Sequence, residues 1–296
     1  MPLALFLTHS HPPAYNERME STEVTSAGEM TQTVRVDRWA ASDCRSDEDS
    51  LVVEEPMEIR LNDISFAVTM RTPGQDEALA VGFLATEGVL RSADDLYDIT
   101  RCADPQHPDL HNILGVYIDP ERMPDELQSG RQRYANSSCG LCGKATIDAV
   151  RQFAPAIVNA PDVSRALIQL LPDRLRAGQQ VFSRTGGLHA AGLFNREGEL
   201  LVVEEDIGRH NAVDKVVGRA LLSGLWPLEN TILMVSGRAG FEIVQKALAA
   251  RIPTVCSISA PSSLAVQLAQ EAGMTLIGFL RGNTMNVYSG FERVTL

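Results

Sequence analysis

The sequence has no excess of basic residues. Its 296 residues carry 38 acidic side chains against 26 basic ones, which gives a formal net charge of −12. Counterion release from a nucleic-acid backbone therefore cannot drive binding, and we expect no nucleic-acid partner. A small phosphorylated ligand stays compatible with this charge, because a few local arginines and backbone N–H groups can hold a phosphate.

Long apolar runs are also missing. The stretch from Leu3 to Leu7 has no basic residues before it and is too short for a signal segment or a membrane span. We therefore expect a cytoplasmic protein without a membrane partner. Cysteine is scarce: five residues form no disulfide framework, so a reducing compartment should keep them as free thiols.

Local patterns divide the chain into four parts. Residues 1–30 mix polar and apolar residues without periodicity and are expected to form a flexible tail. Residues 31–135 are expected to form a small α+β domain with antiparallel strands. Its predicted elements are a polar linker at Asp43 to Ser50, strands at Met57–Leu61 and Ile64–Met70 joined by an Asn62-Asp63 turn, a helix from Glu77 to Leu90, and a strand at Ile113–Ile118.

From residue 144 to residue 296, strand and helix patterns alternate. The predicted helices are Lys144 to Phe153, Ser164 to Leu171, Arg174 onward, Ala212 to Ser223, Phe241 to Ala250 and Ser262 to Ala272. The predicted strands are Leu188 to Phe194, Leu200 to Glu204, Thr231 to Val235, Thr254 to Ser257 and Thr275 to Leu280. Helices that connect strands in this way predict a three-layer α/β/α domain.

The pattern with the clearest chemistry lies in residues 136–143, between the two domains. Cys139 and Cys142 stand three residues apart, so their thiols can reach a common atom or each other. Gly143 and Lys144 open the next predicted helix, whose N-terminal dipole and ammonium would favour the thiolate. Three other interpretations stay open: a structural zinc site, a thioredoxin-like redox pair, or two ordinary loop cysteines. Cys256, inside an apolar strand, is expected to be a core residue.

Several polar segments follow predicted strands, where α/β sheets bind ligands. Ser236, Gly237 and Arg238 form a turn into a helix and could hold phosphate. Asp206, Arg209 and His210 could line a pocket, although Asp206 could instead cap the next helix and pair with Arg209. His189 follows a Gly-Gly pair, and Arg281 follows the last strong strand. Each of these turns could also be purely structural.

Six segments in order resemble one known family, the formate dehydrogenase accessory sulfurtransferases, FdhD. The segments are SSCGLCGK, FSRTGGLHAAGLF, EDIGRHNAVDKVVGRAL, SGRAGFEIVQKA, CSISAPSSLAV and GFLRGNTMNVYS. The resemblance runs from about Thr33 to the C-terminus and leaves out the tail and residues 103–128. It implies a cytoplasmic homodimer whose C-terminal domain resembles the cytidine deaminase fold.

The resemblance also implies a function. Members of the family accept persulfide sulfur from a cysteine desulfurase and deliver it to the bis-molybdopterin guanine dinucleotide molybdenum cofactor, which formate dehydrogenase requires. Cys139 matches the persulfide-bearing cysteine and Cys142 its partner. The matching cofactor-binding loop comprises Phe279, Leu280, Arg281, Gly282, Asn283 and Thr284. Thr284 is a departure, because many relatives carry a basic residue there.

The sequence thus predicts a sulfurtransferase with a cysteine persulfide intermediate and a pocket for a GDP-like guanine nucleotide. We expect His189, His210, Ser236, Gly237 and Arg238 to bind the cofactor together with the 279–284 loop. No metal is expected, because the H-x-E and P-C-x-x-C pattern of the zinc deaminases is missing. Two alternatives stay open: a cofactor-binding chaperone that transfers no sulfur, and a thiol-disulfide oxidoreductase.

Overall fold

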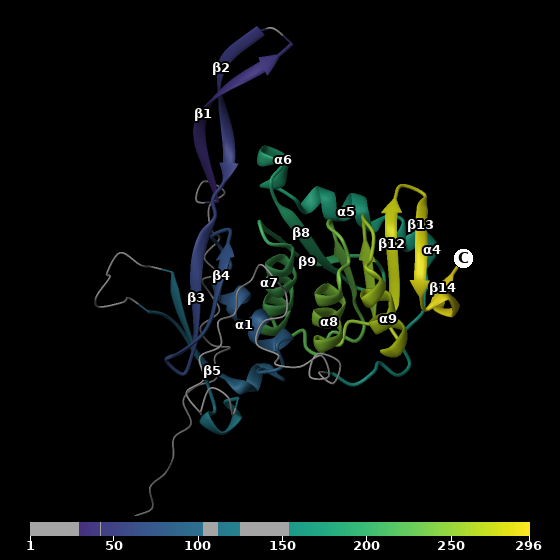
Figure 1. Cartoon of the computed structure of the whole chain (residues 1–296). Coiled ribbons are helices and arrows are strands. Elements are labelled where there is room, and N and C mark those ends of the chain that lie inside the picture. The colour runs from purple at the N-terminus through teal and green to yellow at the C-terminus, as the bar shows by residue number, and fades with distance from the viewer. Residues whose placement is uncertain (1–29, 42, 103–111, 125–153) are drawn as a thin grey trace, which may run out of the picture.

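The computed structural model describes residues 30–41, 43–102, 112–124 and 154–296. The described chain is a mixed α/β structure in which two larger sheets lie on either side of a helical layer (Figure 1). The predicted tail, the helix expected at 144–153 and the boundary between the two domains lie outside the described residues.

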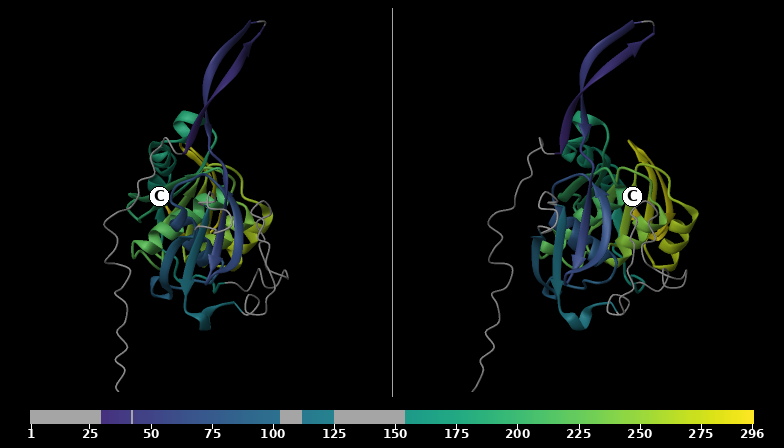
Figure 2. Two further views of the ribbon diagram at one scale, coloured as in Figure 1. Left: turned by 90° about the vertical axis from the view of Figure 1, so that its left-hand side faces the viewer. Right: turned by 60° about the vertical axis from the view of Figure 1, so that its left-hand side comes forward.

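A long β-ribbon projects from the rest of the molecule. Strands β1 (Thr31–Ala40) and β2 (Asp43–Val52) pair along their whole lengths, and the tip of the ribbon extends far beyond the body (Figure 2), while its base at Val52 lies beside Gly187. The expectation of a polar linker at 43–50 is therefore wrong. The strand was not predicted because its residues are solvated and many are charged. The contacts between its side chains and those of β1 are polar: Arg38 Nε lies 3.0 Å from Asp47 Oδ2, and Arg38 Nη2 lies 3.1 Å from Asp49 Oδ1.

The first unit of the body is a four-stranded sheet with the order β4-β3-β6-β5. Its strands are β3 (Glu55–Leu61), β4 (Ile64–Arg71), β5 (Leu96–Cys102) and β6 (Ile113–Ile118). The turn at Asn62 and Asp63 is confirmed, and both residues have the positive φ angles of a tight hairpin. Only antiparallel strands were predicted from the sequence. The sheet is in fact mixed, because β3 pairs with β6 in parallel.

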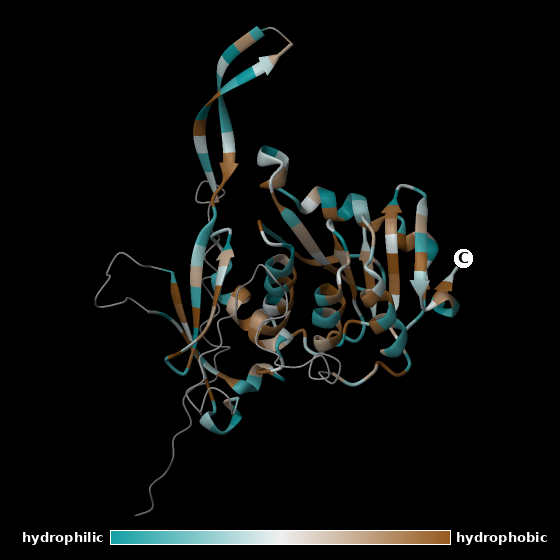
Figure 3. Ribbon diagram, in the orientation of Figure 1, coloured by the Kyte–Doolittle hydropathy of each residue, from teal (hydrophilic) through white to brown (hydrophobic). Residues whose placement is uncertain are grey.

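Helix α1 (Asp76–Thr86) joins this unit to the second one. It is apolar on almost every side after its first two residues (Figure 3), which is typical of a helix buried all round. It ends earlier than predicted, because the chain turns away through Gly88 at a φ of 77°. Ala78 and Gly82 of α1 lie directly against the helix α7 (Arg209–Leu222).

The second unit is a six-stranded sheet with the order β13-β12-β11-β10-β8-β9. Its strands are β8 (His189–Phe194), β9 (Leu200–Asp206), β10 (Ile232–Val235), β11 (Thr254–Ser257), β12 (Thr275–Arg281) and β13 (Thr284–Ser289). The central strands β10, β11 and β12 are parallel, and β8 and β13 run antiparallel to their neighbours. Strand β13 was not predicted, because it is a partly exposed edge strand with a polar sequence.

Helices cover both faces of this sheet. Helices α7, α8 (Phe241–Ala249) and α9 (Ser263–Glu271) lie on the face toward α1, in one apolar core with the first unit. Helices α4 (Arg165–Ile168) and α5 (Leu171–Gly178) pack on the other face over a second core. A short helix, α6 (Phe182–Thr185), follows α5.

Shorter elements complete the fold. Strands β7 (Val163–Ser164) and β14 (Val294–Thr295) form a two-residue parallel pair. Single 3-10 turns occupy Ala93–Asp95, Pro120–Arg122 and Phe291–Arg293. No helix among the described residues is both long enough and apolar enough to span a membrane.

Candidate functional site

The polar segments predicted to follow strands do gather at one edge of the six-stranded sheet. Strands β9, β10, β11 and β12 end there, and the antiparallel strand β8 begins there. The edge is held together by side chains: Ser236 Oγ accepts the Ala190 N–H at 2.8 Å, and Ser257 Oγ donates to the Gly237 carbonyl oxygen at 2.8 Å. We call these strand ends and the turns after them the polar edge.

Three helices begin at the polar edge and direct their N-terminal dipoles toward it. Helix α9 is capped by Ser262, whose Oγ accepts the Ala265 N–H. Helices α7 and α8 are preceded by Gly208 and Gly240, which provide no side-chain cap. Free N–H groups at these two helix ends favour an anion.

Guanidinium groups add positive charge at the same place. Arg209 is half-buried in the first turn of α7, and Arg238 is exposed in the turn after β10. Neither guanidinium group makes a hydrogen bond or ion pair with another described residue. Arg281, at the end of β12, donates from Nε to the Ile258 carbonyl oxygen at 3.1 Å and is otherwise exposed. A chain with a net charge of −12 thus concentrates cations at one edge.

His189 and His210 also lie at the polar edge. A methyl group at Gly237 would come within 3.3 Å of His189 Nδ1, so the imidazole lies against this glycine. Burial lowers the pKa of His189, and the nearby charges of Arg209, His210 and Arg238 lower it further. His189 is therefore mostly neutral at pH 7.

His210 Nε2 lies 3.3 Å from Glu242 Oε2 on α8. This contact lowers the pKa of Glu242. The nearby charge of Arg209 lowers it further, so the Glu242 carboxylate also lies within electrostatic reach of Arg209.

One cavity opens between the polar edge and helices α5 and α6. It has a volume of about 520 Å³ and is lined by His189 and Ser236 on the sheet side and by Arg176 and Phe182 on the helix side. We call it the α5–α6 cavity. Its size lies in the range of small-molecule sites. The predicted residues His189 and Ser236 are thus brought together, and Arg176 and Phe182 are additions that no sequence pattern had indicated.

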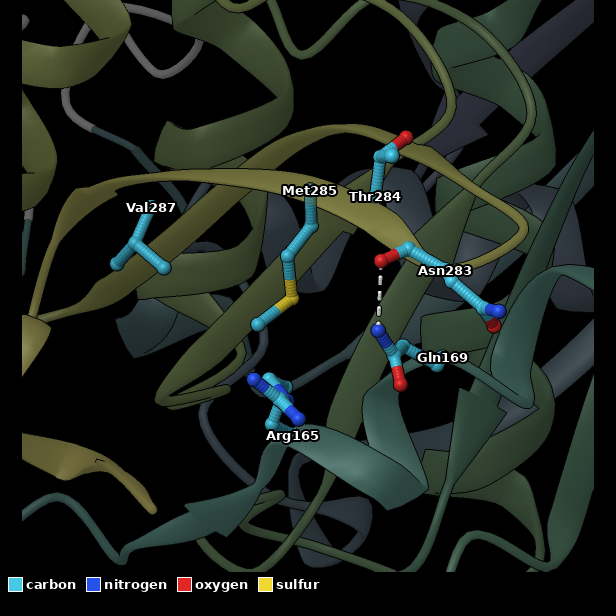
Figure 4. A pocket seen from close by; sticks show the side chains of 6 residues that line it. All are labelled: Arg165, Gln169, Asn283, Thr284, Met285 and Val287. Carbon is cyan, nitrogen blue, oxygen red and sulfur yellow. Dashed lines mark hydrogen bonds between the residues drawn. The ribbon is translucent and has the colours of Figure 1, made fainter. Parts of the chain in front are cut away.

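A second cavity of about 580 Å³ lies between α4 and the β12–β13 turn (Figure 4). Gln169 Nε2 donates to the Asn283 carbonyl oxygen at 2.8 Å across it, and Thr284 and Met285 line it. Arg165 lies at the base of this cavity, and its guanidinium group makes no hydrogen bond or ion pair with any described residue. It places a positive charge opposite Thr284, where the sequence comparison had suggested that a basic residue is missing.

The 279–284 loop has an unusual backbone. Phe279 and Gly282 both have positive φ angles, of 49° and 50°, and the Phe279 side chain is 40% exposed. Thr284 Oγ1 donates to the Arg281 carbonyl oxygen and closes the turn. Leu280, which the resemblance implied as a cofactor-binding residue, has its side chain in the second core. Only its backbone is available to a ligand.

Residues 205–211, the EDIGRHN segment, lie partly at the polar edge and partly in the interior of the protein. Asp206 pairs with Lys215 at 2.7 Å, and both side chains are almost completely buried. The suggested pairing of Asp206 with Arg209 is therefore wrong. Lys215 also donates to the Thr72 carbonyl oxygen, and Asn211 donates to the Met70 carbonyl oxygen, so these residues bind the second unit to β4 and to the residue that follows it.

The structure describes one of the cysteines discussed above, Cys256, and only part of the residues that could hold a metal ion. Cys139 and Cys142 lie outside the described residues. Cys256 is completely buried, as predicted, and burial raises the pKa of its thiol to about 12. Within the described ranges, no three His, Cys, Asp or Glu side chains form a group that could hold a metal ion.

Comparisons with known proteins cover most of the chain. A sequence model of the FdhD/NarQ family matches residues 52–295. A protein of Streptomyces avermitilis named sulfur carrier protein FdhD is 53% identical over 274 residues, which cover 91% of this chain and 97% of the relative. A protein of Saccharolobus solfataricus with the same name is 45% identical over 256 residues, covering 86% and 94%.

A solved structure is similar as well. The crystal structure of a candidate formate dehydrogenase accessory protein from Desulfotalea psychrophila superposes with a TM-score of 0.70 at 27% identity. The similarity covers 90% of this chain and 99% of that one.

Proposed function

The chain belongs to the FdhD/NarQ family, and from this membership we propose that it is a sulfurtransferase. It accepts sulfur from a cysteine desulfurase as a persulfide on Cys139. It then passes the sulfur to the bis-molybdopterin guanine dinucleotide molybdenum cofactor, which formate dehydrogenase requires. The relatives named sulfur carrier proteins support this proposal, as does the presence of Cys139 and Cys142 within the matched residues 52–295.

The observation that carries the cofactor half of the proposal is the polar edge. Arg209 and Arg238 lie there without partners among the described residues, beside two helix N-termini that lack side-chain caps. The cofactor is an anion with pyrophosphate groups, and such groups bind where N–H donors and guanidinium groups converge. The site residues of the proposal are His189, His210, Ser236, Gly237, Arg238 and the 279–284 loop.

The sulfur steps balance without an external oxidant. The Cys139 thiolate attacks the terminal sulfur of the desulfurase persulfide; a new S–S bond forms on Cys139, and the old bond leaves its electron pair on the desulfurase cysteine. For release, the Cys142 thiolate attacks Cys139 Sγ. The products are hydrosulfide and a Cys139–Cys142 disulfide, so the two thiols supply the electrons and a cellular dithiol reduces the disulfide again.

The proposal extends to architecture and assembly. The C-terminal domain, which contains the six-stranded unit, spans residues 144–296 and has a cytidine-deaminase-like fold. The remaining parts are a smaller α+β domain at 31–135, a reactive loop at 136–143 and a tail at 1–30. The protein acts as a homodimer in the cytoplasm. The order of strands and helices from β8 to β13, with helices on both faces of the sheet, supports the assignment.

The test is intact-protein mass spectrometry after incubation with a cysteine desulfurase and cysteine. We expect one added sulfur on the full chain and none on Cys139→Ser, which keeps nearly the same volume but loses the nucleophile. Cys256 serves as an internal control, because its buried thiol should gain no sulfur.

The same substitution separates the rival functions. A pure cofactor chaperone needs no persulfide, so Cys139→Ser would still mature formate dehydrogenase in cells that lack the wild-type copy. That result would replace sulfur transfer with the chaperone function. A thiol-disulfide oxidoreductase would instead show a stable Cys139–Cys142 disulfide and no added sulfur.

A further inference from the structure

The α5–α6 cavity contains a stacked pair of side chains. The guanidinium carbon of Arg176, near the end of α5, lies 4.3 Å from the centroid of the Phe182 ring at the start of α6. Arg176 is exposed, and its guanidinium group makes no hydrogen bond or ion pair with any other described residue. The pair therefore presents a flat cationic surface whose N–H groups are not engaged.

The position of Phe182 is set by a buried carboxylate. Glu205 Oε2 accepts the Val181 N–H and Oε1 accepts the Phe182 N–H, both at 2.8 Å. Glu205 is only 8% exposed and belongs to β9, so it ties the start of α6 to the sheet. The side of the cavity that carries the pair is thus built before any ligand arrives, which lowers the entropic cost of binding.

The side of the cavity that belongs to the sheet has hydrogen-bonding groups beside the apolar Ile258. It contains His189, whose ring is mostly neutral at pH 7, and Ser236. A flat wall facing hydrogen-bonding groups is the arrangement that recognises a heterocycle, because the π-face stacks while the ring edge forms hydrogen bonds. A phosphate alone would need the N–H edge of Arg176 and would have no use for the Phe182 ring.

We propose that Arg176 and Phe182 form the stacking surface for a flat 2-amino-oxo bicyclic ring, the chemistry that guanine and pterin share. The inference rests on the proposed function, since the cofactor of that function carries both rings. It assigns the ring to the α5–α6 cavity and leaves the phosphates to the arginines of the polar edge. Arg176 and Phe182 are then binding residues that determine specificity for the ring.

The test measures binding of three probes to the full chain by calorimetry: GDP, 6-hydroxymethylpterin and inorganic pyrophosphate. Arg176→Lys keeps the charge and removes the plane; Phe182→Leu keeps the apolar volume and removes the ring. Base stacking on such surfaces is worth about 1–3 kcal/mol, so each variant should weaken a ring-bearing probe roughly 10-fold. Pyrophosphate binding should not change, and Phe182→Tyr should bind like the wild type.

The two ring probes identify the source of the ring. If the variants lose affinity for GDP alone, the ring in the α5–α6 cavity is guanine. If they lose affinity for the pterin alone, that ring is the pterin. Arg196→Lys, in the β8–β9 turn at the opposite edge of the sheet, is the matched control and should change nothing. Because Arg176 is exposed, Arg176→Lys remains informative if Phe182→Leu proves unstable.

Two outcomes would overturn the inference. One is unchanged affinity of Arg176→Lys for both ring probes, or a wild type that binds neither. The other is an equal loss of pyrophosphate binding, which would make Arg176 a phosphate ligand. Persulfide formation on Cys139 is measured separately in the same proteins. Its absence in the wild type would refute sulfur transfer, whereas binding data alone decide the stacking surface.

Discussion

Two regions of this protein are rich in charge, and they differ in whether the charges have partners. In the layer between β4, α1 and α7, Asp206 pairs with Lys215 and Asp214 pairs with Lys246, all nearly or completely buried. At the polar edge, Arg209 and Arg238 have no such partners among the described residues. A buried charge without a partner costs several kilocalories per mole, whereas an exposed cation is hydrated and stays available to a ligand.

One helix, α7, supplies residues to both regions. The first turn of α7 presents Arg209 and His210 to the edge, while Asn211, Asp214 and Lys215 are buried against the first unit. A periodicity of 3.6 residues separates the two faces. Substitutions on one face should therefore affect folding, and substitutions on the other should affect ligand binding.

The largest effect is expected from Lys215→Ala in the paired layer. The change leaves the Asp206 carboxylate buried without its cation, which typically costs about 3–5 kcal/mol. The lower end applies, because Asp206 still accepts N–H groups from Thr72, Gly208 and Asn211. The free energy of unfolding from urea titration checks this value.

A double variant and an edge variant control this experiment. Asp206→Asn with Lys215→Met removes both charges and should recover much of the lost stability. Arg238→Ala, on an exposed side chain, should change stability by less than about 0.5 kcal/mol. Equal losses in Lys215→Ala and Arg238→Ala would erase the distinction between the regions.

The corresponding change at the polar edge is Arg281→Ala. Removing a charged partner of a phosphate costs about 1.5–3 kcal/mol, so GDP should bind roughly 10-fold more weakly or worse while stability stays the same. Calorimetry and thermal unfolding on the same sample measure both quantities. Arg196→Ala, an exposed arginine in the turn at the other edge, should bind GDP normally. A wild type that binds no GDP would dispose of the nucleotide site.

A smaller effect is expected where α1 crosses α7. A Cβ at Gly218 would lie 1.9 Å from the Ala78 carbonyl oxygen, so the helices must separate to admit it. Overpacking of this kind costs about 1–3 kcal/mol, and Gly218→Ala should lower the melting temperature accordingly. Gly240→Ala is the control, because its Cβ would meet only the Glu242 side chain, at 3.4 Å. A Gly218→Ala protein as stable as the wild type would contradict the close crossing.

The smallest effect concerns His189. Its pKa in the folded chain lies below the ordinary value of 6.5, chiefly because of burial. As the pH falls below 6.5, the unfolded chain takes up a proton before the folded chain does, so the wild type loses stability there. His189→Gln lacks this loss.

The measurement compares the melting temperatures of wild type and variant between about pH 8 and pH 5.5. The difference should grow in favour of His189→Gln on acidification. GDP should reduce that difference, because an anion beside His189 favours the protonated imidazole. A difference independent of pH would show that the pKa of His189 is not lowered in the folded chain.

Elements whose signals are local could be predicted from the amino-acid sequence alone. The Asn62-Asp63 turn, the strand at Ile113–Ile118 and the strand at Thr254–Ser257 were predicted at the observed positions, because turn chemistry and apolar runs need only near neighbours. The polar segments after β9, β10 and β12 were also predicted to meet, since strands of one direction end at one edge. The family followed from six short segments in order.

The role of each polar residue, in contrast, depends on its neighbours in the folded chain. Nothing local distinguishes Asp206, paired inside the protein, from Arg209 three residues later at the edge. The strand at 43–52 was missed because its partner, β1, rather than its own pattern, makes it a strand. Arg165, Arg176 and Phe182 line cavities because α4, α5 and α6 pack over the sheet. Charges, cavities and edge strands depend on contacts between distant segments, and those contacts form only when the whole chain is packed.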